Sequence, residues 1–224
     1  MPDIPTQTPV PVIQPQNPQQ PQQPPKPQFP ASTLAPSKLG TSGSVVVTEN
    51  PDGTKSYTSI ITGEVLSPGS YLQLLDTLYH AKKGDVITIK IASPGGMVET
   101  GAAFLTAFEN TQARVKTVGI GLVASIAAVI WLAGHDREML PGSTLMVHGP
   151  SGFQMGKVSS IKEECDQIEK YFSYMITKLS DGILTDDQLH AVLTGRQDIF
   201  IPGEELNPKV AAYKHTIASI QRGE

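Results

Sequence analysis

Cysteine is almost absent from this sequence, and other marks of particular protein classes are missing too. The 224 residues contain one cysteine, Cys165, which excludes an internal disulfide framework and suits a reducing cytosol. Seventeen lysines and arginines stand against 21 aspartates and glutamates, so no basic surplus indicates nucleic-acid binding, and no polybasic run indicates a membrane surface. No basic segment followed by an apolar one opens the chain, so we expect no secretory signal peptide.

A membrane-spanning helix is not predicted either. The uncharged stretch that comes nearest runs from Val118 to Gly134 and has 17 residues, short of the about 20 that a span needs. Gly119, Gly121 and Ser125 interrupt it. We therefore interpret this stretch as a buried strand followed by a buried helix.

Proline and glutamine dominate the start of the chain. Twelve of the 19 prolines come before residue 40, and charged or large apolar residues are scarce there. Such a segment cannot bury enough apolar surface to offset the entropy lost on ordering. We expect residues 1–42 to form a disordered tail with polyproline II character, which suits a spacer better than a docking ligand, and residues 43–224 to form one domain.

Beyond the tail, β-rich and helical segments alternate. Two β-rich runs flank Asn50-Pro51-Asp52-Gly53, a strong hairpin signal. Strands are then predicted over 86–92, 115–121 and 144–147, and helices over 70–83, 97–110, from 125, 157–179, 185–193 and from 202. This order is typical of right-handed βαβ units in an α/β fold, with ligands at the carboxyl ends of the strands.

Ser125 lies where a β-rich run gives way to helix formers. Backbone N–H groups are unpaired at a helix start, and the helix dipole favours a developing negative charge there. A serine in this place is most often a helix cap. His148 follows the strand 144–147 and precedes Gly-Pro, where a histidine is usually a turn residue. Together, a serine at a strand-to-helix elbow and a histidine at a strand end are two of the three parts of a hydrolytic triad.

Gly95 and Gly96 follow the strand 86–92 almost directly. Two glycines at a strand end let the backbone approach a ligand closely, and one can present its N–H outward. A tight turn without further purpose explains this motif equally well. Because Gly96, Ser125 and His148 all come at the carboxyl ends of predicted strands, we expect them at one edge of a sheet.

Several motifs in order resemble those of the proteolytic subunit of Clp proteases, a family of the larger ClpP/crotonase fold. They are Ser93-Pro94-Gly95-Gly96, the stretch 121–128 (GLVASIAA) and the stretch 146–150 (MVHGP), with further similarity at 60–65, in the long helix and at 196–200. The resemblance covers about residues 57–206. The separations from Gly96 to Ser125 (29) and from His148 to Asp198 (50) fit the family's pattern. It implies an α/β fold of stacked βαβ units with a protruding long helix.

The resemblance implies a serine endopeptidase with the triad Ser125, His148 and Asp198. Ser125 would attack the scissile carbonyl, His148 would carry the proton, and Asp198 would orient the imidazole. The N–H groups of Gly96 and Ile126 would bind the oxyanion. Neither a metal nor a cofactor is implied.

The same resemblance implies protein or peptide substrates, a ring-shaped homo-oligomer of two stacked rings, and an AAA+ unfoldase partner. The chain departs from the family in three places. A proline-rich tail and a hairpin replace the short apolar segment that meets the unfoldase, so the N-terminal sequence does not support that partner. Arg196-Gln197 stands where the family has an Asp-Arg pair, and the family's last strand motif is not recognisable over 206–213. Such divergent copies are expected of phage or accessory genes, which predicts the cytoplasm of the cell or of a phage host.

Three other functions remain open. A crotonase-type acyl-CoA enzyme would leave Ser125, His148 and Asp198 jointly unexplained, and a serine–lysine hydrolase would need a placed lysine. A catalytically silent ring subunit or assembly scaffold would use the tail for docking. Other reactive residues receive ordinary interpretations: Cys165 and Trp131 as packing residues, and the remaining histidines, which lack the spacing of a metal site, as structural or surface residues. Those histidines are His80, His135, His190 and His215.

Overall fold

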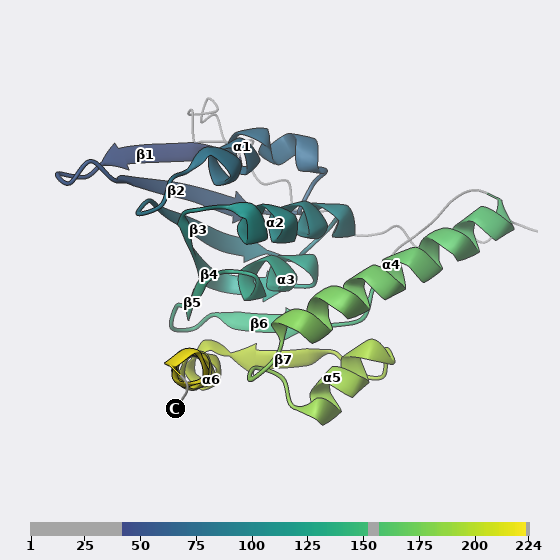
Figure 1. Cartoon of the computed structure of the whole chain (residues 1–224). Helices are drawn as coiled ribbons and strands as arrows, with labels where there is room; N and C mark the ends of the chain where they lie inside the picture. Colours follow the sequence, from purple (N-terminus) through teal and green to yellow (C-terminus); the bar gives the residue numbers. More distant parts are fainter. Residues whose placement is uncertain (1–41, 152–156, 223–224) are drawn as a thin grey trace, which may run out of the picture. The chain divides into compact units, whose positions relative to one another are not determined.

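A mixed sheet forms the centre of the structure, a computed structural model that describes residues 42–151 and 157–222. The predicted tail therefore lies outside the described residues except for Ser42, and its disorder stays a prediction. Seven strands of the described ranges join in the order β1-β2-β3-β4-β6-β7, with β5 attached to β4 (Figure 1). They are β1 (Val45–Glu49), β2 (Lys55–Thr62), β3 (Val86–Ser93), β4 (Arg114–Ala124), β5 (Asp136–Met139), β6 (Thr144–Val147) and β7 (Ile199–Pro202).

Helices follow most of the strands, as the α/β prediction requires. They are the short 3-10 helix η1 (Pro68–Tyr71), α1 (Leu72–His80), α2 (Val98–Asn110), α3 (Ile126–Leu132), α4 (Val158–Leu179), α5 (Asp186–Leu193) and α6 (Gly203–Arg222). The pairs β2–β3, β3–β4 and β4–β6 are parallel, whereas the predicted β1–β2 hairpin and the β6–β7 pair are antiparallel. The α/β fold class is confirmed.

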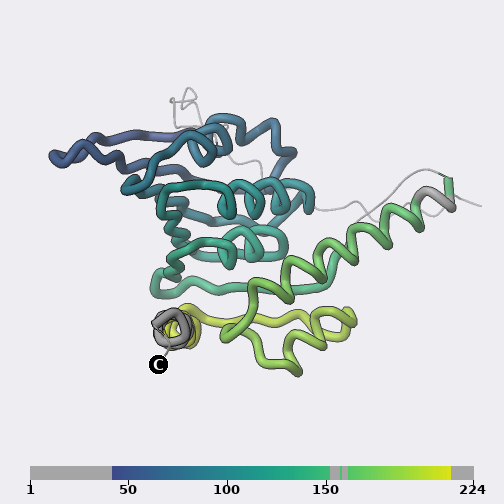
Figure 2. Tube along the Cα trace, viewed as in Figure 1, coloured from purple at the N-terminus to yellow at the C-terminus, as the bar shows by residue number. Residues whose placement is uncertain are grey.

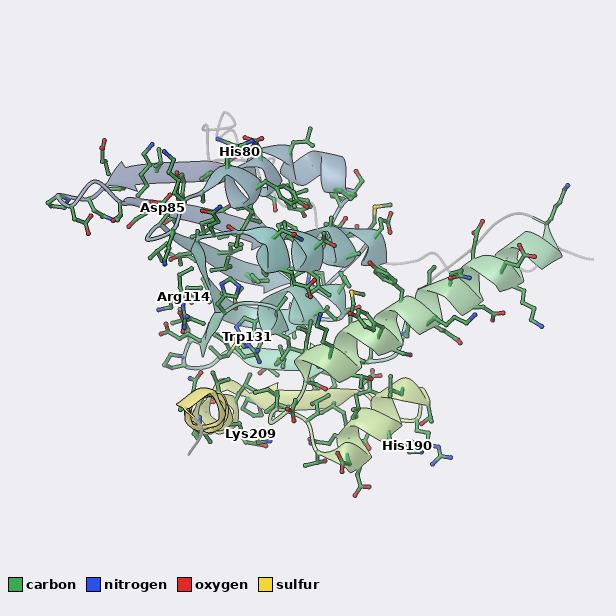
Figure 3. The ribbon with its side chains drawn as sticks, viewed as in Figure 1. His80, Asp85, Arg114, Trp131, His190 and Lys209 are labelled. Atoms are coloured by element: carbon green, nitrogen blue, oxygen red, sulfur yellow. The ribbon has the colours of Figure 1, made fainter. Side chains whose placement is uncertain are left out.

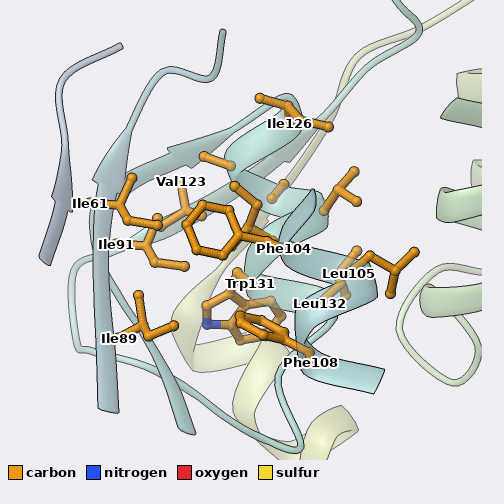
Figure 4. Packing of buried hydrophobic residues seen from close by; sticks show 14 of the residues in the cluster. Ile61, Ile89, Ile91, Phe104, Leu105, Phe108, Val123, Ile126, Trp131 and Leu132 are labelled. Atoms are coloured by element: carbon orange, nitrogen blue, oxygen red, sulfur yellow. The ribbon is translucent and has the colours of Figure 1, made fainter. Parts of the chain in front are cut away.

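One face of the sheet is covered by α1, α2 and α3 (Figure 1). Strand β3 shows why, because its isoleucines at 87, 89 and 91 are fully buried while Lys90 between them is exposed. Ile89 and Ile91 meet Phe104 and Phe108 of α2 and Trp131 of α3 in the core (Figure 4). Each such buried side chain contributes roughly 1.5–3 kcal/mol of transfer free energy.

The uncharged stretch 118–134 is a strand end followed by a buried helix. Every residue of α3 is at most 1% exposed, as predicted. The strand is buried at Val118, Gly119, Val123 and Ala124, but Gly121 and Leu122 are exposed, so the prediction of a fully buried strand was wrong there. No helix in the described ranges is both long and apolar enough to cross a lipid bilayer.

Strand β4 is longer than predicted and changes partners along its length. Residues 116–119 pair with β5, and residues 122–124 pair with β6. Its register against β3 shifts between Ile91 and Ser93. Two glycines of β4 accommodate this irregularity: Gly121 has φ +61°, and a Cβ on Gly119 would lie 2.2 Å from Met139 Sδ. Strand β5, with the polar sequence DREM, was not predicted.

Helix α4 packs on the domain only through its C-terminal half. Phe172, Met175 and Ile176 are buried, whereas Cys165 near its start is exposed. Cys165 therefore does not pack within its own domain, because the first half of α4 extends away from the sheet (Figure 2), and packing against another subunit stays a prediction. A salt bridge from Lys178 to Glu109 ties the packed half to α2.

Helix α6 occupies the stretch in which no final strand was recognised, residues 206–213. Near its start, the Asn207 side chain takes the place of a neighbouring strand at the free edge of β5. Its Oδ1 accepts from the Met139 N–H at 2.9 Å, and its Nδ2 donates to the Met139 carbonyl at 2.7 Å.

His135 links β4 to the end of α2. Its Nδ1 accepts from the Val115 N–H at 3.0 Å, and its Nε2 lies 3.2 Å from the Phe108 carbonyl. Partial burial lowers the pKa of His135 below its ordinary value of 6.5, and the Arg114 cation lowers it further while the Phe108 carbonyl partly offsets both. Protonation of Nδ1 would also break the bond from Val115.

We predict that His135 makes the domain less stable toward acid. Because its pKa is lower in the folded state, its contribution is complete above about pH 6.5 and is lost as the pH falls through the folded-state pKa. The difference in unfolding free energy between wild type and His135→Gln, measured by urea titration from pH 8 to pH 5, should shift against wild type at the acid end. A difference that does not change with pH would contradict this.

Candidate active site

The carboxyl ends of three neighbouring strands meet at one edge of the sheet. Strands β3, β4 and β6 are parallel and adjacent, so the residues that follow them share this edge. Gly96 comes after β3, Ser125 directly after β4 and His148 directly after β6. The structure thus places these three residues as the sequence predicted.

Ser125 has a strained backbone. Its φ and ψ are 57° and −128°, and it is the one non-glycine residue of the described ranges with positive φ. Three hydrogen bonds hold it there: its N–H donates to the Met146 carbonyl at 3.0 Å, and its carbonyl accepts from Ala128 at 3.0 Å and Val129 at 3.3 Å. Strain of this kind costs about 1–3 kcal/mol and is concentrated at functional sites, including the strand-to-helix turn that exposes a nucleophilic serine.

The Ser125 hydroxyl does not cap the helix. Ser125 occupies the N-cap position of α3, but its side chain makes no capping hydrogen bond. The residue is half-buried, and none of the hydrogen bonds among the described residues uses its Oγ. The simplest alternative interpretation of this serine, a structural cap, therefore does not account for its side chain.

Gly95 packs directly against the Ser125 side chain. A Cβ on Gly95 would lie 2.5 Å from Ser125 Cβ, 3.1 Å from Ser125 Oγ and 2.9 Å from the Ala124 carbonyl. Gly95 also has φ +103°, which side chains disfavour. Its N–H donates to the buried Ser93 hydroxyl at 3.1 Å, which holds the turn. The glycine pair is thus a close approach to Ser125, and a simple turn is not a sufficient explanation.

Gly96 presents its own N–H toward the β4 side. It forms a parallel bridge with Val65 in which Val65 N–H donates to the Gly95 carbonyl at 2.7 Å and Met97 N–H donates to the Val65 carbonyl at 2.8 Å. In a parallel bridge the central residue directs its own N–H to the opposite side. Val65 follows β2 on one side of β3, so the Gly96 N–H faces the other side, where Ser125 follows β4.

Ile126 supplies a second free donor beside Ser125. As the first residue of α3 its N–H has no intrahelical partner. Neither this N–H nor that of Gly96 donates to an acceptor among the described residues. The Ile126 side chain is buried against α2, where a Cβ on Gly101 would lie 2.3 Å from Ile126 Cδ1. The Ile126 N–H thus directly follows the strained serine, and the Gly96 N–H faces the side of β3 on which Ser125 lies.

His148 and Asp198 occupy the first positions beyond the β6–β7 ladder. The last pair is Val147 with Ile199, so His148 and Asp198 would be the next pair. Directly opposite residues in such a ladder have Cα atoms about 4.5–5.5 Å apart. Gly149 then passes the end of α5, where its Cβ would lie 3.0 Å from the Val192 carbonyl.

The side chains of the predicted triad are brought to one region but are not joined. Among the hydrogen bonds of the described residues, none links Ser125 to His148 or His148 to Asp198. His148 is half-buried and Asp198 is exposed. Val65, which fixes Gly96, was missed by the sequence analysis, since an apolar residue after a strand carries no mark of such a role.

The other histidines of the described chain give no competing site. His80 and His190 lie far apart (Figure 3), and no group of three or more potential metal ligands occurs in the described ranges. His80 pairs with Asp76 on its own helix.

Comparison with known proteins gives a family for most of this region. The family model described as Clp protease matches residues 61–196, which include Gly96, Ser125 and His148 and end just before Asp198. An ATP-dependent Clp protease proteolytic subunit from Bacteroides thetaiotaomicron is 35% identical over 105 residues, 46% of this chain and 48% of that protein.

Two further relatives carry similar names. An ATP-dependent Clp protease proteolytic subunit 1 from Synechococcus sp. (strain CC9902) is 30% identical over 155 residues, 66% of this chain and 78% of that protein. A subunit 2 from Thermobifida fusca is 40% identical over 84 residues, 37% of this chain and 41% of that protein. The chain spans about half the length of the Bacteroides relatives it matches.

We predict that glycine relieves the strain at position 125. Ser125→Gly should have an unfolding free energy about 1 kcal/mol higher than Ser125→Ala, because only glycine adopts this backbone conformation freely. Ser67 is an exposed control with an ordinary φ of −57°, where glycine should be the less stable of the two substitutions. Unfolding free energies are measured by urea titration. If the glycine variant is more stable than the alanine variant at both positions, or less stable at both, the strain at Ser125 is contradicted.

Proposed function

Because this chain belongs to the Clp protease family, we propose that it is a serine endopeptidase with the triad Ser125, His148 and Asp198. The observation that carries the proposal is the conformation of Ser125. Its backbone is held in a strained elbow, its hydroxyl is not used for capping, the free Ile126 N–H directly follows it, and the free Gly96 N–H faces its side of β3. A structural serine needs none of these features.

The chemistry follows from these positions. Ser125 Oγ attacks the scissile carbonyl carbon while an imidazole nitrogen of His148 takes its proton, and a bond forms between Oγ and that carbon. The tetrahedral intermediate collapses when His148 returns the proton to the leaving amine, which breaks the C–N bond. Water then attacks the acyl-enzyme in the same way and releases the carboxylate product.

The N–H groups of Gly96 and Ile126 would stabilise the oxyanion. Negative charge develops on the former carbonyl oxygen in the transition state, and donors already aimed at that point need no reorganisation. Removing one such donor typically costs about 2.7–4 kcal/mol of transition-state stabilisation. The start of α3 adds the positive end of a helix dipole.

Asp198 would orient His148 through the extension of the β6–β7 ladder. The two residues come directly after the last pair of the ladder, Val147 with Ile199, and this register supports an approach of the carboxylate to the imidazole. Hydrogen bonds of catalytic groups are often long before substrate binds and tighten in the complex.

The substrates we propose are polypeptides, cleaved inside a ring of identical subunits. The exposed first half of α4 supports the ring, because Ile161, Cys165 and Ile168 form an apolar stripe that this chain does not cover completely. Short peptides have no fold to be unfolded before cleavage. We therefore propose that their hydrolysis needs no ATP-driven unfoldase. The single cysteine supports a cytoplasmic location.

A catalytically silent subunit is the second candidate. The absence of hydrogen bonds between Ser125, His148 and Asp198 favours it, as does the exposure of Asp198. Activity measurements separate the two.

We predict that purified protein hydrolyses fluorogenic peptides and is labelled by a fluorophosphonate at Ser125. Ser125→Ala should lose labelling, and its kcat should fall by about 10⁶-fold, whereas Asp198→Asn should lose about 10⁴-fold because the histidine loses its orienting partner. Peptide mass spectrometry identifies the labelled residue.

Matched controls come from residues outside the site. His148→Gln should also lose activity, because the proposed general base is removed, and His80→Gln, at an exposed histidine on α1, is its control. Asp181→Asn, at another exposed aspartate, is the control for Asp198→Asn. Labelling at another serine, or peptide hydrolysis that survives in Ser125→Ala, would overturn the triad. Wild-type protein without labelling or hydrolysis would establish the silent subunit.

A further inference from the structure

The position of Gly96 is set by the backbone of Val65. A Cβ on Gly96 would lie 2.2 Å from the Val65 carbonyl oxygen and 2.8 Å from the Val65 nitrogen. The two hydrogen bonds of the Val65–Gly96 bridge flank this contact. Any shift of Val65 therefore moves the Gly96 N–H as well.

Val65 and Leu66 lie outside the regular ladder, since β2 ends at Thr62. Two buried side chains hold Leu66 instead. Thr100 Oγ1 donates to the Leu66 carbonyl at 2.6 Å, and the Leu66 N–H donates to the Tyr71 hydroxyl at 3.3 Å. The Tyr71 ring is itself fixed by an edge contact with Phe104, with ring centroids 5.5 Å apart.

Thr100 is an unusual member of its helix. It lies in the first turn of α2 and is 0% exposed. Deeper in a helix, a threonine hydroxyl can bond to the carbonyl three or four residues earlier, but for Thr100 those residues, Met97 and Gly96, precede α2. This one bonds to a carbonyl 34 positions earlier in the chain. A buried hydroxyl without a hydrogen-bond partner is unfavourable. The bond to the Leu66 carbonyl therefore stabilises the buried position of Thr100 as well as the position of Leu66.

These contacts connect Gly96 to Thr100 by two routes. Along the chain, Gly96 leads through Met97 into α2, which carries Thr100. Through space, Thr100 is hydrogen-bonded to Leu66, and the adjacent Val65 is paired with Gly96. We propose that Thr100 is a positioning residue for the oxyanion site, acting through Leu66 and Val65 to fix the direction of the Gly96 N–H. This inference rests on the proposed peptidase function.

Two substitutions separate the hydroxyl from the volume of Thr100. Thr100→Val keeps the shape and removes the donor, whereas Thr100→Ser keeps the donor. With Thr100→Val, kcat for a fluorogenic peptide should fall about 10-fold while KM changes less than about 2-fold, since a displaced donor weakens the transition state more than the bound substrate. The rate of fluorophosphonate labelling of Ser125 should also fall about 10-fold. The separate variant Thr100→Ser keeps the hydroxyl, so its kcat and labelling rate should stay within about 3-fold of wild type.

Thr117 offers a matched control. It is also 0% exposed, and its Oγ1 donates to the Trp131 carbonyl at 2.7 Å within the core. Thr117→Val therefore removes the same kind of buried bond away from the Gly96 bridge. It should lower the melting temperature about as much as Thr100→Val but leave kcat and labelling within about 2-fold of wild type.

The outcomes test the role of Thr100 separately from the proposed peptidase function. Wild-type protein that neither hydrolyses peptide nor labels at Ser125 would overturn the peptidase function and this inference with it. An active wild type with unchanged kcat in Thr100→Val, or with equal losses in Thr117→Val, would overturn the positioning role alone. Loss in Thr100→Val with rescue in Thr100→Ser supports it.

Discussion

The backbone of Ser125 is the constraint on which the rest of the site depends. A non-glycine residue at φ 57° and ψ −128° persists only where its surroundings over-determine it. Here β6 supplies an acceptor for its N–H, and the first turn of α3 supplies donors to its carbonyl. The fully buried apolar side chains of α3 fix that turn to the core. Core packing thereby supports the strained backbone of a half-buried serine.

Close backbone approach is the second requirement, and it explains where glycine is needed. Gly95 leaves room for the Ser125 side chain, and Gly96 leaves room for the Val65 carbonyl. The irregular register of β4 against β3 and its change of partner from β5 to β6 bring the three strand ends together. The donors of Gly96 and Ile126 are therefore placed by the sheet and its helices, and in the proposed triad only Ser125, His148 and Asp198 would contribute side-chain chemistry.

Sequence patterns predicted the arrangement of Gly96, Ser125 and His148 because strand ends in parallel sheets share an edge, and the predicted elements were largely confirmed. The patterns failed where tertiary context decided the outcome. Strand β5 is polar because it lies at a sheet edge, so it has no apolar signal. Cys165 belongs to an apolar stripe that its own domain does not cover. The Thr100–Leu66 bond, between residues 34 positions apart, has no local signature.

The most direct measurement is a crystal structure of the protein after reaction with a fluorophosphonate. We expect a phosphonyl group on Ser125 Oγ, with its oxygen about 2.7–3.1 Å from the N–H nitrogens of both Gly96 and Ile126. We also expect His148 beside the modified oxygen and within hydrogen-bond distance of Asp198. An adduct elsewhere, or one whose oxygen points to solvent away from Gly96 and Ile126, would contradict the proposed active site.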